Sequence, residues 1–236
     1  SNDIINVEKV NDIISQDDDI RDTIIQAINE SNNRIVLLCN GLTVLPSWTE
    51  SLENVNGFII LNTLNTGLFE NMLHFSNIQV LYLLKVKTKA IPSSIKEFKK
   101  LKTLEICDSE IQDKSISDSI GELEELQSLK LVGTNIEYLP NAINRLTKLE
   151  SLNISNTSVI SLPDNIGDLC NLKTLDISDT SITELPNSIN KLDKLEHFYL
   201  YNLTIRKMPW FNNCKKGLDV FSTNFDRYIP SLINVF

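Results

Sequence analysis

The sequence is poor in aromatic residues and glycine, and it has no long uninterrupted hydrophobic run. Aromatics make up 7% of the 236 residues and only 7 residues are glycine, so Leu, Ile and Val supply most of the apolar content. No stretch approaches the roughly 18 consecutive apolar residues of a membrane-spanning helix. The start, SNDIINVEKV, lacks the basic segment followed by an apolar one that marks a signal peptide. We therefore expect a soluble chain with no membrane partner.

Clustered positive charge is also scarce. The net charge is −9, which argues against a general nucleic-acid partner because neutralising phosphates requires clustered Lys and Arg. The local exception is residues 85–102, which contain seven lysines. We interpret this segment as a solvated face offset by the acidic stretches 16–22 and 121–125. The alternative is a surface that attracts an acidic partner.

Motifs that carry chemistry are missing as well. The two histidines, His74 and His197, are more than a hundred residues apart, which leaves no two-histidine metal cluster. Neither GxxxxGK[ST] nor GxGxxG occurs, so no phosphate-binding loop is present in the sequence. We therefore expect no catalytic residues, no metal, no cofactor and no enzymatic activity.

What the sequence does contain is a repeat with a period of 23 residues. Pro46 and Pro92 are separated by twice this period, and Phe69 occupies the midpoint. Ser117 takes the place of proline in the following unit, which carries two extra residues within 110–115. The remaining prolines of the series are spaced by 23 residues each: Pro140, Pro163, Pro186 and Pro209.

Each unit reads LxxLxIxxTxIxxLPxxIxxL. Segments 149–155 and 172–178 alternate apolar and polar residues, as a half-buried strand does. Segment 187–195, after the proline, spaces its apolar residues by three, which predicts a short helical or 3₁₀ turn. One such unit is too small to bury a core, so identical units must stack and join their strands in a parallel sheet.

This pattern resembles the leucine-rich-repeat proteins, specifically the 23-residue type of Ras-suppressor-like, Roco and plant disease-resistance-receptor proteins. The resemblance extends over residues 24–218 and is best in LDISDTSITELPNSINKLDKLEHF, residues 175–198. It implies an α/β fold: a curved solenoid with a parallel sheet on the concave side and short helical or 3₁₀ segments on the convex side. It also implies regulatory protein partners such as small GTPases, or recognition of foreign molecules. It brings no catalytic motif.

We predict three segments along the chain. Residues 3–32 show apolar spacings of three and four and are expected to form an N-terminal helical cap. Residues 33–217 form about eight repeat units, and residues 218–236 provide a ninth strand followed by an aromatic-rich cap. The residue after each strand is usually Asn in this family, but here it is mostly Thr or Ser, with Val86 and Leu203 as exceptions. We expect these turns to be held less uniformly.

The four cysteines lie too far apart for disulfides. Cys39 and Cys107 occupy nearly equivalent positions three units apart, or roughly 14 Å at about 4.8 Å per strand. Cys170 and Cys214 are two units apart, or about 10 Å by the same estimate. A disulfide needs Cα atoms within about 7 Å. We therefore expect reduced thiols buried by packing, which favours an intracellular location.

Function in a solenoid resides in the strand residues that point outward from the concave face. In the first three units this register displays an apolar patch, for which two explanations remain open. In the first, the N-terminal helices fold over the patch, or the register differs in this region so that these residues do not point outward. In the second, the patch binds a partner or a second copy of the chain. Exposed Tyr82 and Leu84 would favour the second explanation. The patch comprises Val36, Leu38, Ile59, Leu61, Val80, Tyr82 and Leu84.

The outward residues of the last units are polar and aromatic, and we expect Tyr199 and Tyr201 to anchor a partner. The predicted function is a non-catalytic protein-interaction module. The alternatives are a sensing segment of a larger receptor or signalling protein, and a secreted microbial factor that engages host proteins. The candidate contact residues are Tyr82, Leu84, Glu105, Lys130, Asn153, Asp176, Asp179, His197, Tyr199, Tyr201 and Asn202.

Overall fold

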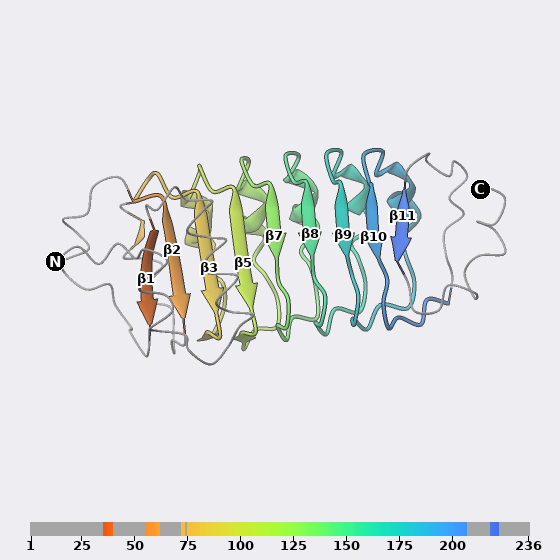
Figure 1. The fold of residues 1–236 in the computed structure, drawn as a ribbon, viewed down its shortest axis with the longest axis horizontal. Helices are drawn as coiled ribbons and strands as arrows, with labels where there is room; N and C mark the ends of the chain where they lie inside the picture. Colours follow the sequence, from red (N-terminus) through yellow and green to blue (C-terminus); the bar gives the residue numbers. More distant parts are fainter. Residues whose placement is uncertain (1–34, 40–54, 62–71, 74, 207–217, 222–236) are drawn as a thin grey trace.

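The computed structural model describes residues 35–39, 55–61, 72–73, 75–206 and 218–221. These residues form one nine-stranded parallel sheet in which strands succeed one another in chain order, side by side along the molecule (Figure 1). The predicted cap helices of residues 3–32 lie outside the described residues. The strands of the sheet are β1 (Ile35–Cys39), β2 (Gly57–Leu61), β3 (Val80–Leu84), β5 (Thr103–Cys107), β7 (Ser128–Lys130), β8 (Ser151–Asn153), β9 (Thr174–Asp176), β10 (His197–Tyr199) and β11 (Asp219–Phe221).

The pairing of the strands confirms the repeat period in the middle of the array and corrects it at both ends. Leu152 of β8 pairs with Leu175 of β9, one full period later. At the first step, however, Leu37 pairs with Ile59, and at the last step Tyr199 pairs with Phe221, so both intervals are one residue shorter than the period. The register predicted for Val36 and Leu38 is therefore wrong by one residue, and a uniform period is wrong by the same amount at β11.

The inward leucines form one continuous core behind the sheet. The central inward row is at most 1% exposed in β5, β7, β8 and β9, where it is leucine, and β10 continues it with Phe198. Full burial of one such side chain stabilises the fold by about 1.5–3 kcal/mol. Because each coil contributes only a few apolar residues, this gain depends on the neighbouring coils that cover them.

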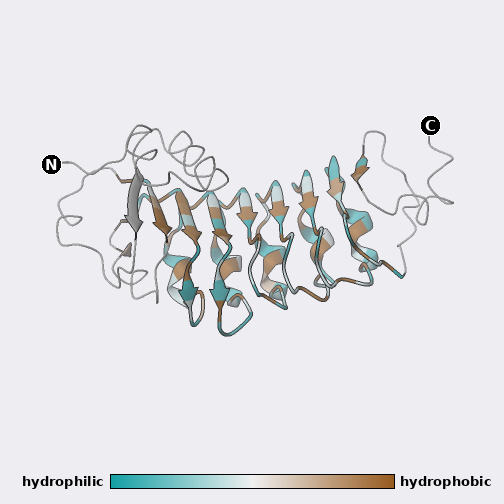
Figure 2. Cartoon of the chain, turned by 60° about the horizontal axis from the view of Figure 1, so that its bottom comes forward, coloured by the Kyte–Doolittle hydropathy of each residue, from teal (hydrophilic) through white to brown (hydrophobic). Residues whose placement is uncertain are grey.

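In three of the described repeat units, which we call coils, the proline of the series immediately precedes a 3₁₀ helix on the side opposite the sheet (Figure 2). The carbonyl of Pro92 accepts the N–H of Ile95 at 3.1 Å, and Pro140 and Pro186 repeat this arrangement. Proline fits because its φ is preset near the observed −69° and no N–H is needed there. The 3₁₀ helices are η2 (Ser93–Glu97), η3 (Asp118–Glu122), η4 (Asn141–Arg145), η5 (Ile166–Asp168) and η6 (Asn187–Lys191).

Ser117 replaces the proline as predicted. It has an extended backbone with φ −59°, its carbonyl accepts the N–H of Ile120 at 3.0 Å, and its hydroxyl accepts the N–H of Ser119. The two extra residues of this coil follow the short strand β6 (Glu110–Ile111), which pairs with β4 (Lys87–Thr88). The chain turns there through Lys114, whose φ is 51°.

In the nine-stranded sheet, a residue with left-handed backbone follows each strand from β3 to β10 within three positions. Asn, Asp and Gly fill most of these positions, in agreement with their tolerance of positive φ. At Gly133, whose φ is 66°, an added Cβ would also displace the carboxylate of Asp108, but the positive φ is the main reason for glycine. The positions are Lys85, Asp108, Gly133, Asn156, Asp179 and Asn202.

The turns next to these residues are held by hydroxyl groups in two different ways. Thr157 Oγ1 donates to the carbonyl of Ile154 at 2.7 Å, and the equivalent threonines of the neighbouring coils do the same. Val86 has no hydroxyl, and its N–H donates instead to Ser109 Oγ of the next coil at 3.0 Å. The predicted unevenness at this position is thus present at Val86, where the adjacent coil supplies the missing polar atom.

Ion pairs between adjacent coils offset part of the basic segment. Lys87 Nζ lies 3.1 Å from Glu110, and Lys99 Nζ lies 3.7 Å from Glu122 in the acidic stretch 121–125. All four side chains are exposed, so each pair contributes at most about 1 kcal/mol to stability. The interpretation of this segment as a solvated, internally balanced face is confirmed for these lysines.

Of the described cysteines, Cys107 and Cys170 carry free thiols, as expected. Cys107 is half-buried, whereas Cys170 is exposed and does not pack as predicted. Among the described residues, no helix combines the length and the apolar character needed to cross a bilayer.

Candidate binding surface

The outward central row of the sheet is one continuous line of side chains. It is read from the pairing of successive strands, and it differs between the two halves of the molecule: apolar at the first strands, polar and then aromatic at the last. The row is Ile59, Tyr82, Glu105, Lys130, Asn153, Asp176, Tyr199 and Phe221.

The apolar half of this row is not available to a partner. Tyr82 is 0% exposed and Leu84 is 2% exposed, so other parts of the chain cover them. Neither belongs to the continuous core behind the sheet, in agreement with their outward register. Their expected role as exposed contact residues is wrong, and so is self-association through this patch in the folded chain. The alternative, that the chain covers its own patch, is favoured.

Glu105 is a further correction, because it is only 4% exposed. Its carboxylate lies 3.5 Å from Nζ of Lys130 in the next strand, and this partner compensates the buried charge. The adjacent thiol of Cys107 has its pKa raised to about 12, mainly by burial and secondarily by the Glu105 charge. Lys130 is half-buried and marks the point where the row emerges from its cover.

Beyond Lys130 the row continues with a hydrogen-bonded pair. Asn153 Nδ2 donates to Asp176 Oδ2 at 3.3 Å, and Asp176 Oδ1 accepts the N–H of Ser178 at 3.0 Å. Asn153 Oδ1 accepts the N–H of Ser155 at 2.9 Å. These bonds fix both side chains at the ends of β8 and β9 while leaving them half-buried rather than covered.

The last two strands carry an aromatic cluster. The rings of Tyr199 and Phe221 are stacked with centroids 4.7 Å apart and planes inclined by 10°. Tyr201 lies 6.4 Å from Tyr199, and His197 lies 6.3 Å from Phe221. Tyr201 is 37% exposed, one of the few large apolar side chains in the described part of the chain to reach the surface. Tyrosine is enriched at protein interfaces, which makes this cluster a candidate contact surface.

Carboxylates surround the cluster. Asp179 accepts a hydrogen bond from Asn202 Nδ2 at 2.7 Å, and both residues are exposed. Asp219 is exposed and its Oδ2 lies 3.6 Å from Nδ1 of His197, too far for a hydrogen bond but close enough for an ion pair when the imidazole is protonated. We call the set the concave strip: Asn153, Asp176, Asp179, His197, Tyr199, Tyr201, Asn202, Asp219 and Phe221.

Asp219 and Phe221 are the two members of the concave strip that the sequence analysis did not assign to it. An interval of one full period turns both of them toward the core and places Ser222 outward. The sequence contains a signal against that interval. A full period would turn the charged side chain of Asp219 toward the apolar core, and burying an unpaired charge is costly. The interval that is one residue shorter turns Val220 inward instead, as observed.

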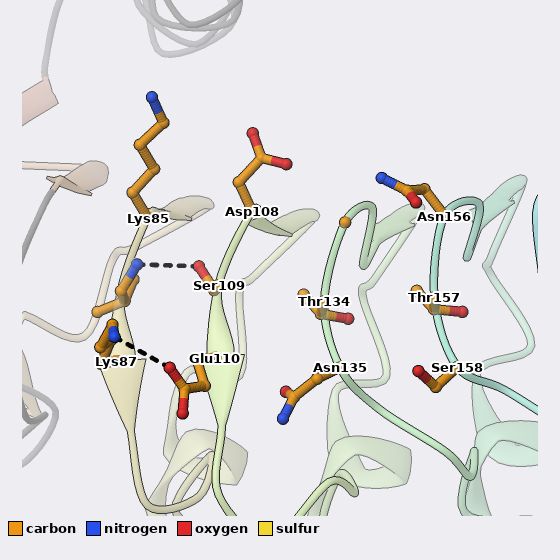
Figure 3. Close-up of a pocket in the computed structure, with 12 residues that line it drawn as sticks. Lys85, Lys87, Asp108, Ser109, Glu110, Thr134, Asn135, Asn156, Thr157 and Ser158 are labelled. Carbon is orange, nitrogen blue, oxygen red and sulfur yellow. Dashed lines mark hydrogen bonds and ion pairs between the residues drawn. The ribbon is translucent and has the colours of Figure 1, made fainter.

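A second concavity runs along the turns after β3, β5, β7 and β8. It has a volume of about 530 Å³, and Lys85 and Asp108 project at its rim (Figure 3). The hydroxyls of Ser109 and Thr157 in its wall hydrogen-bond the backbone and support the fold. Within the residues described, no three His, Cys, Asp or Glu side chains are grouped to hold a metal. The concave strip is therefore the better candidate site.

The geometry defines a class of protein, a parallel-sheet solenoid with 3₁₀ helices on its outer side. Residues 145–216 match the family model described as a leucine-rich repeat region. This stretch is thus a leucine-rich repeat region, and the described strands and 3₁₀ helices have the leucine-rich-repeat fold. The comparison with curated proteins found no significant match to this sequence.

Several solved structures share the fold. A leucine-rich-repeat protein of Leptospira interrogans aligns with a TM-score of 0.57 and 21% identity, over 75% of this chain and 51% of that one. This chain thus spans about half its length. The leucine-rich-repeat domain of the type III effector XopL aligns with a TM-score of 0.65 and 19% identity, over 92% and 87%.

A plant receptor also shares the fold. The ectodomain of the Arabidopsis thaliana receptor kinase GASSHO1/SCHENGEN3, in complex with CASPARIAN STRIP INTEGRITY FACTOR 2, aligns with a TM-score of 0.52 and 21% identity, over 81% of this chain and 27% of the receptor chain. At these identities the likenesses establish the fold.

Proposed function

We propose that this chain is a non-catalytic module that binds a protein partner through the concave strip. The observation that carries the proposal is the contrast along one row of outward side chains. Tyr82 and Glu105 at one end are covered by the chain itself, whereas Asp176 and Tyr199 at the other end are partly open and Tyr201 is exposed. A binding surface must be open, and within the described row this condition is met at the end that carries Asp176 and Tyr199.

The chemistry of the concave strip supports the proposal. Tyrosine provides a large rigid contact area with a polar end and is enriched among the residues that dominate binding energies. Tyr199 and Tyr201 are held on β10 and in the turn after it, whose neighbours on both sides are hydrogen-bonded strands. Little conformational entropy is therefore lost when a partner docks. The plant receptor ectodomain that shares this fold carries a bound factor in its solved structure.

The test is a comparison of Tyr199→Ala/Tyr201→Ala with Tyr138→Ala. Tyr138 is 51% exposed but lies outside the concave strip, two residues before Pro140, so its variant controls for the loss of an exposed aromatic ring. Partners captured by the intact chain are identified and purified, and their affinities for the three proteins are measured by calorimetry. We expect affinity to fall at least about tenfold for the double variant, since each anchor contributes about 1 kcal/mol or more. Affinities equal to that of the Tyr138→Ala protein would exclude this surface.

A further inference from the structure

We propose that the concave strip recognises a positively charged segment of its partner, with arginine side chains as the main contacts. This inference rests on the proposed function and specifies the chemistry of the partner. It follows from the charges, the hydrogen bonds and the ring geometry of β8 to β11.

The strand and turn segments that form the concave strip contain no lysine or arginine. Residues 151–156, 174–179, 197–202 and 218–221 include three aspartates and one histidine as their only ionisable side chains apart from tyrosine. The nearest cation in the row is Lys130, whose charge is directed to Glu105 at 3.5 Å. At the edge before β9, Lys173 bonds Glu150 at 2.8 Å. The concave strip is therefore a locally negative surface.

Among the described residues, the hydrogen-bond donors that orient Asp176 and Asp179 are neutral. The donors to Asp176 are the amide of Asn153 and the backbone of Ser178, and Asp179 accepts from the amide of Asn202. These neutral donors fix the carboxylates without removing their charge. Asp219 is the aspartate that a described group can offset. Nδ1 of His197 lies 3.6 Å from its Oδ2, and His197 carries a positive charge only when it is protonated. The carboxylates thus keep acceptor sites for a cation.

The aromatic rings add attraction of the same sign. Tyr199 pairs with Asp176 on one side and with Phe221 on the other. One face of Tyr199 is stacked on Phe221 at 4.7 Å, and the strand on its other side is β9, which carries Asp176 in register with it. The faces of aromatic rings attract cations, and a guanidinium both stacks on rings and bonds carboxylates in a bidentate manner. Arginine satisfies both groups at once.

The spacing of the aspartates suggests the spacing of the arginines. Asp176 and Asp219 lie two strands apart and are offset by two residues along the strands, which together is about 12 Å. An extended peptide covers that distance in about four residues, and side chains four positions apart point to the same side of it. A segment with basic residues four positions apart can therefore reach both carboxylates.

The experiment uses a Gly/Ser peptide that contains two arginines four positions apart, and a second peptide with citrulline in their place. Citrulline keeps the shape and removes the charge. The peptides are titrated into the ¹⁵N-labelled chain, and chemical-shift changes are followed by NMR. We expect saturable shifts centred on residues 174–179, 197–202 and 218–221 with the arginine peptide, and none that saturate with citrulline.

Two variants with the same change in net charge separate local recognition from general attraction to an acidic chain. Asp176→Asn/Asp219→Asn removes charge from the concave strip, whereas Asp113→Asn/Asp164→Asn removes it from exposed positions elsewhere. We expect affinity for the arginine peptide to fall about fivefold or more in the first variant and to change less than about twofold in the second. Dispersed NMR spectra confirm that both variants fold.

Equal binding of the two peptides, or equal weakening in both variants, would overturn the inference. Its failure differs from failure of the proposed function. If a partner no longer binds the Tyr199→Ala/Tyr201→Ala protein but binds Asp176→Asn/Asp219→Asn normally, the concave strip is a binding surface and the proposed preference for cationic partners is wrong. If the partner ignores the tyrosine changes, the proposed function falls whatever the peptides do.

Discussion

The contact between η5 and η6 leads to the sharpest prediction about the fold. Gly167 in η5 faces the backbone of the next coil, and a Cβ at this position would lie 2.0 Å from the carbonyl oxygen of Ser188 and 2.7 Å from its carbonyl carbon. Backbone atoms cannot turn aside as a side chain can. Gly121 meets the carbonyl of Ala142 in the same way at 2.4 Å, so the contact recurs between coils.

The size of the effect of Gly167→Ala follows from these distances. Ordinary van der Waals contact begins at 3.4 Å, whereas the added Cβ would meet its nearest atom at 2.0 Å, so the coils must separate locally by more than an ångström. Overpacking of this kind destabilises proteins by about 1–3 kcal/mol. Alanine also lowers the conformational entropy of the unfolded chain, which stabilises the folded state by about 0.4–1 kcal/mol. We therefore expect a net loss of about 1–2 kcal/mol in the free energy of unfolding.

Urea unfolding followed by circular dichroism measures this loss, and Asn144→Ala is the matched control. Asn144 occupies the equivalent position in η4 and already has a Cβ, so its truncation removes only an exposed hydrogen bond to Asp168 at 3.3 Å. We expect the control to change stability by less than about 0.5 kcal/mol. A Gly167→Ala protein as stable as the wild type would refute the close approach of the two coils.

Two further predictions concern buried polar groups. Thr157→Val removes the hydrogen bond to the carbonyl of Ile154 while keeping the shape of the side chain. We expect urea unfolding to show that the free energy of unfolding falls by about 1 kcal/mol and that Thr157→Ser restores it. A Val protein as stable as the wild type would contradict the role of the hydroxyl. At pH 8, iodoacetamide should modify exposed Cys170 at least about tenfold faster than Cys107, as judged by mass spectrometry of peptides, because the raised pKa of Cys107, about 12, keeps its thiol protonated. The Cys107 thiolate becomes abundant only as pH rises toward that value, so equal rates at pH 8 would show that the site is not buried.

Much of the fold could be predicted because it repeats. The recurrent leucines and prolines specify a strand, a turn and a 3₁₀ segment in each coil, and even Ser117 could be placed by alignment with its neighbours. The left-handed turn also left a signal, since Asp108, Gly133 and Asn156 are residue types that tolerate positive φ. A period identifies whatever is common to all coils.

What the period could not predict depends on contacts that occur once. The intervals at β1–β2 and β10–β11 are one residue shorter than the period. A uniform period therefore puts Ser222 in the position that Phe221 occupies. Tyr82 and Leu84 are buried although their register points outward, and a repeat period carries no information on this burial. The repeat pattern therefore identifies the outward row of side chains but not which part of that row is open.

The two sides of the solenoid are held by different forces, and this separates stability from binding. On the concave side, backbone hydrogen bonds such as Asp179 N–H to the Tyr201 carbonyl at 2.9 Å fix the strand spacing. On the convex side, close packing at Gly167 fixes the distance between coils. An alanine there should widen the convex side and leave the spacing of the concave strip unchanged. We therefore expect Gly167→Ala to bind the arginine peptide within about twofold of wild type despite its lower stability. A loss as large as that of Asp176→Asn/Asp219→Asn would mean that the curvature of the solenoid itself positions the contacts.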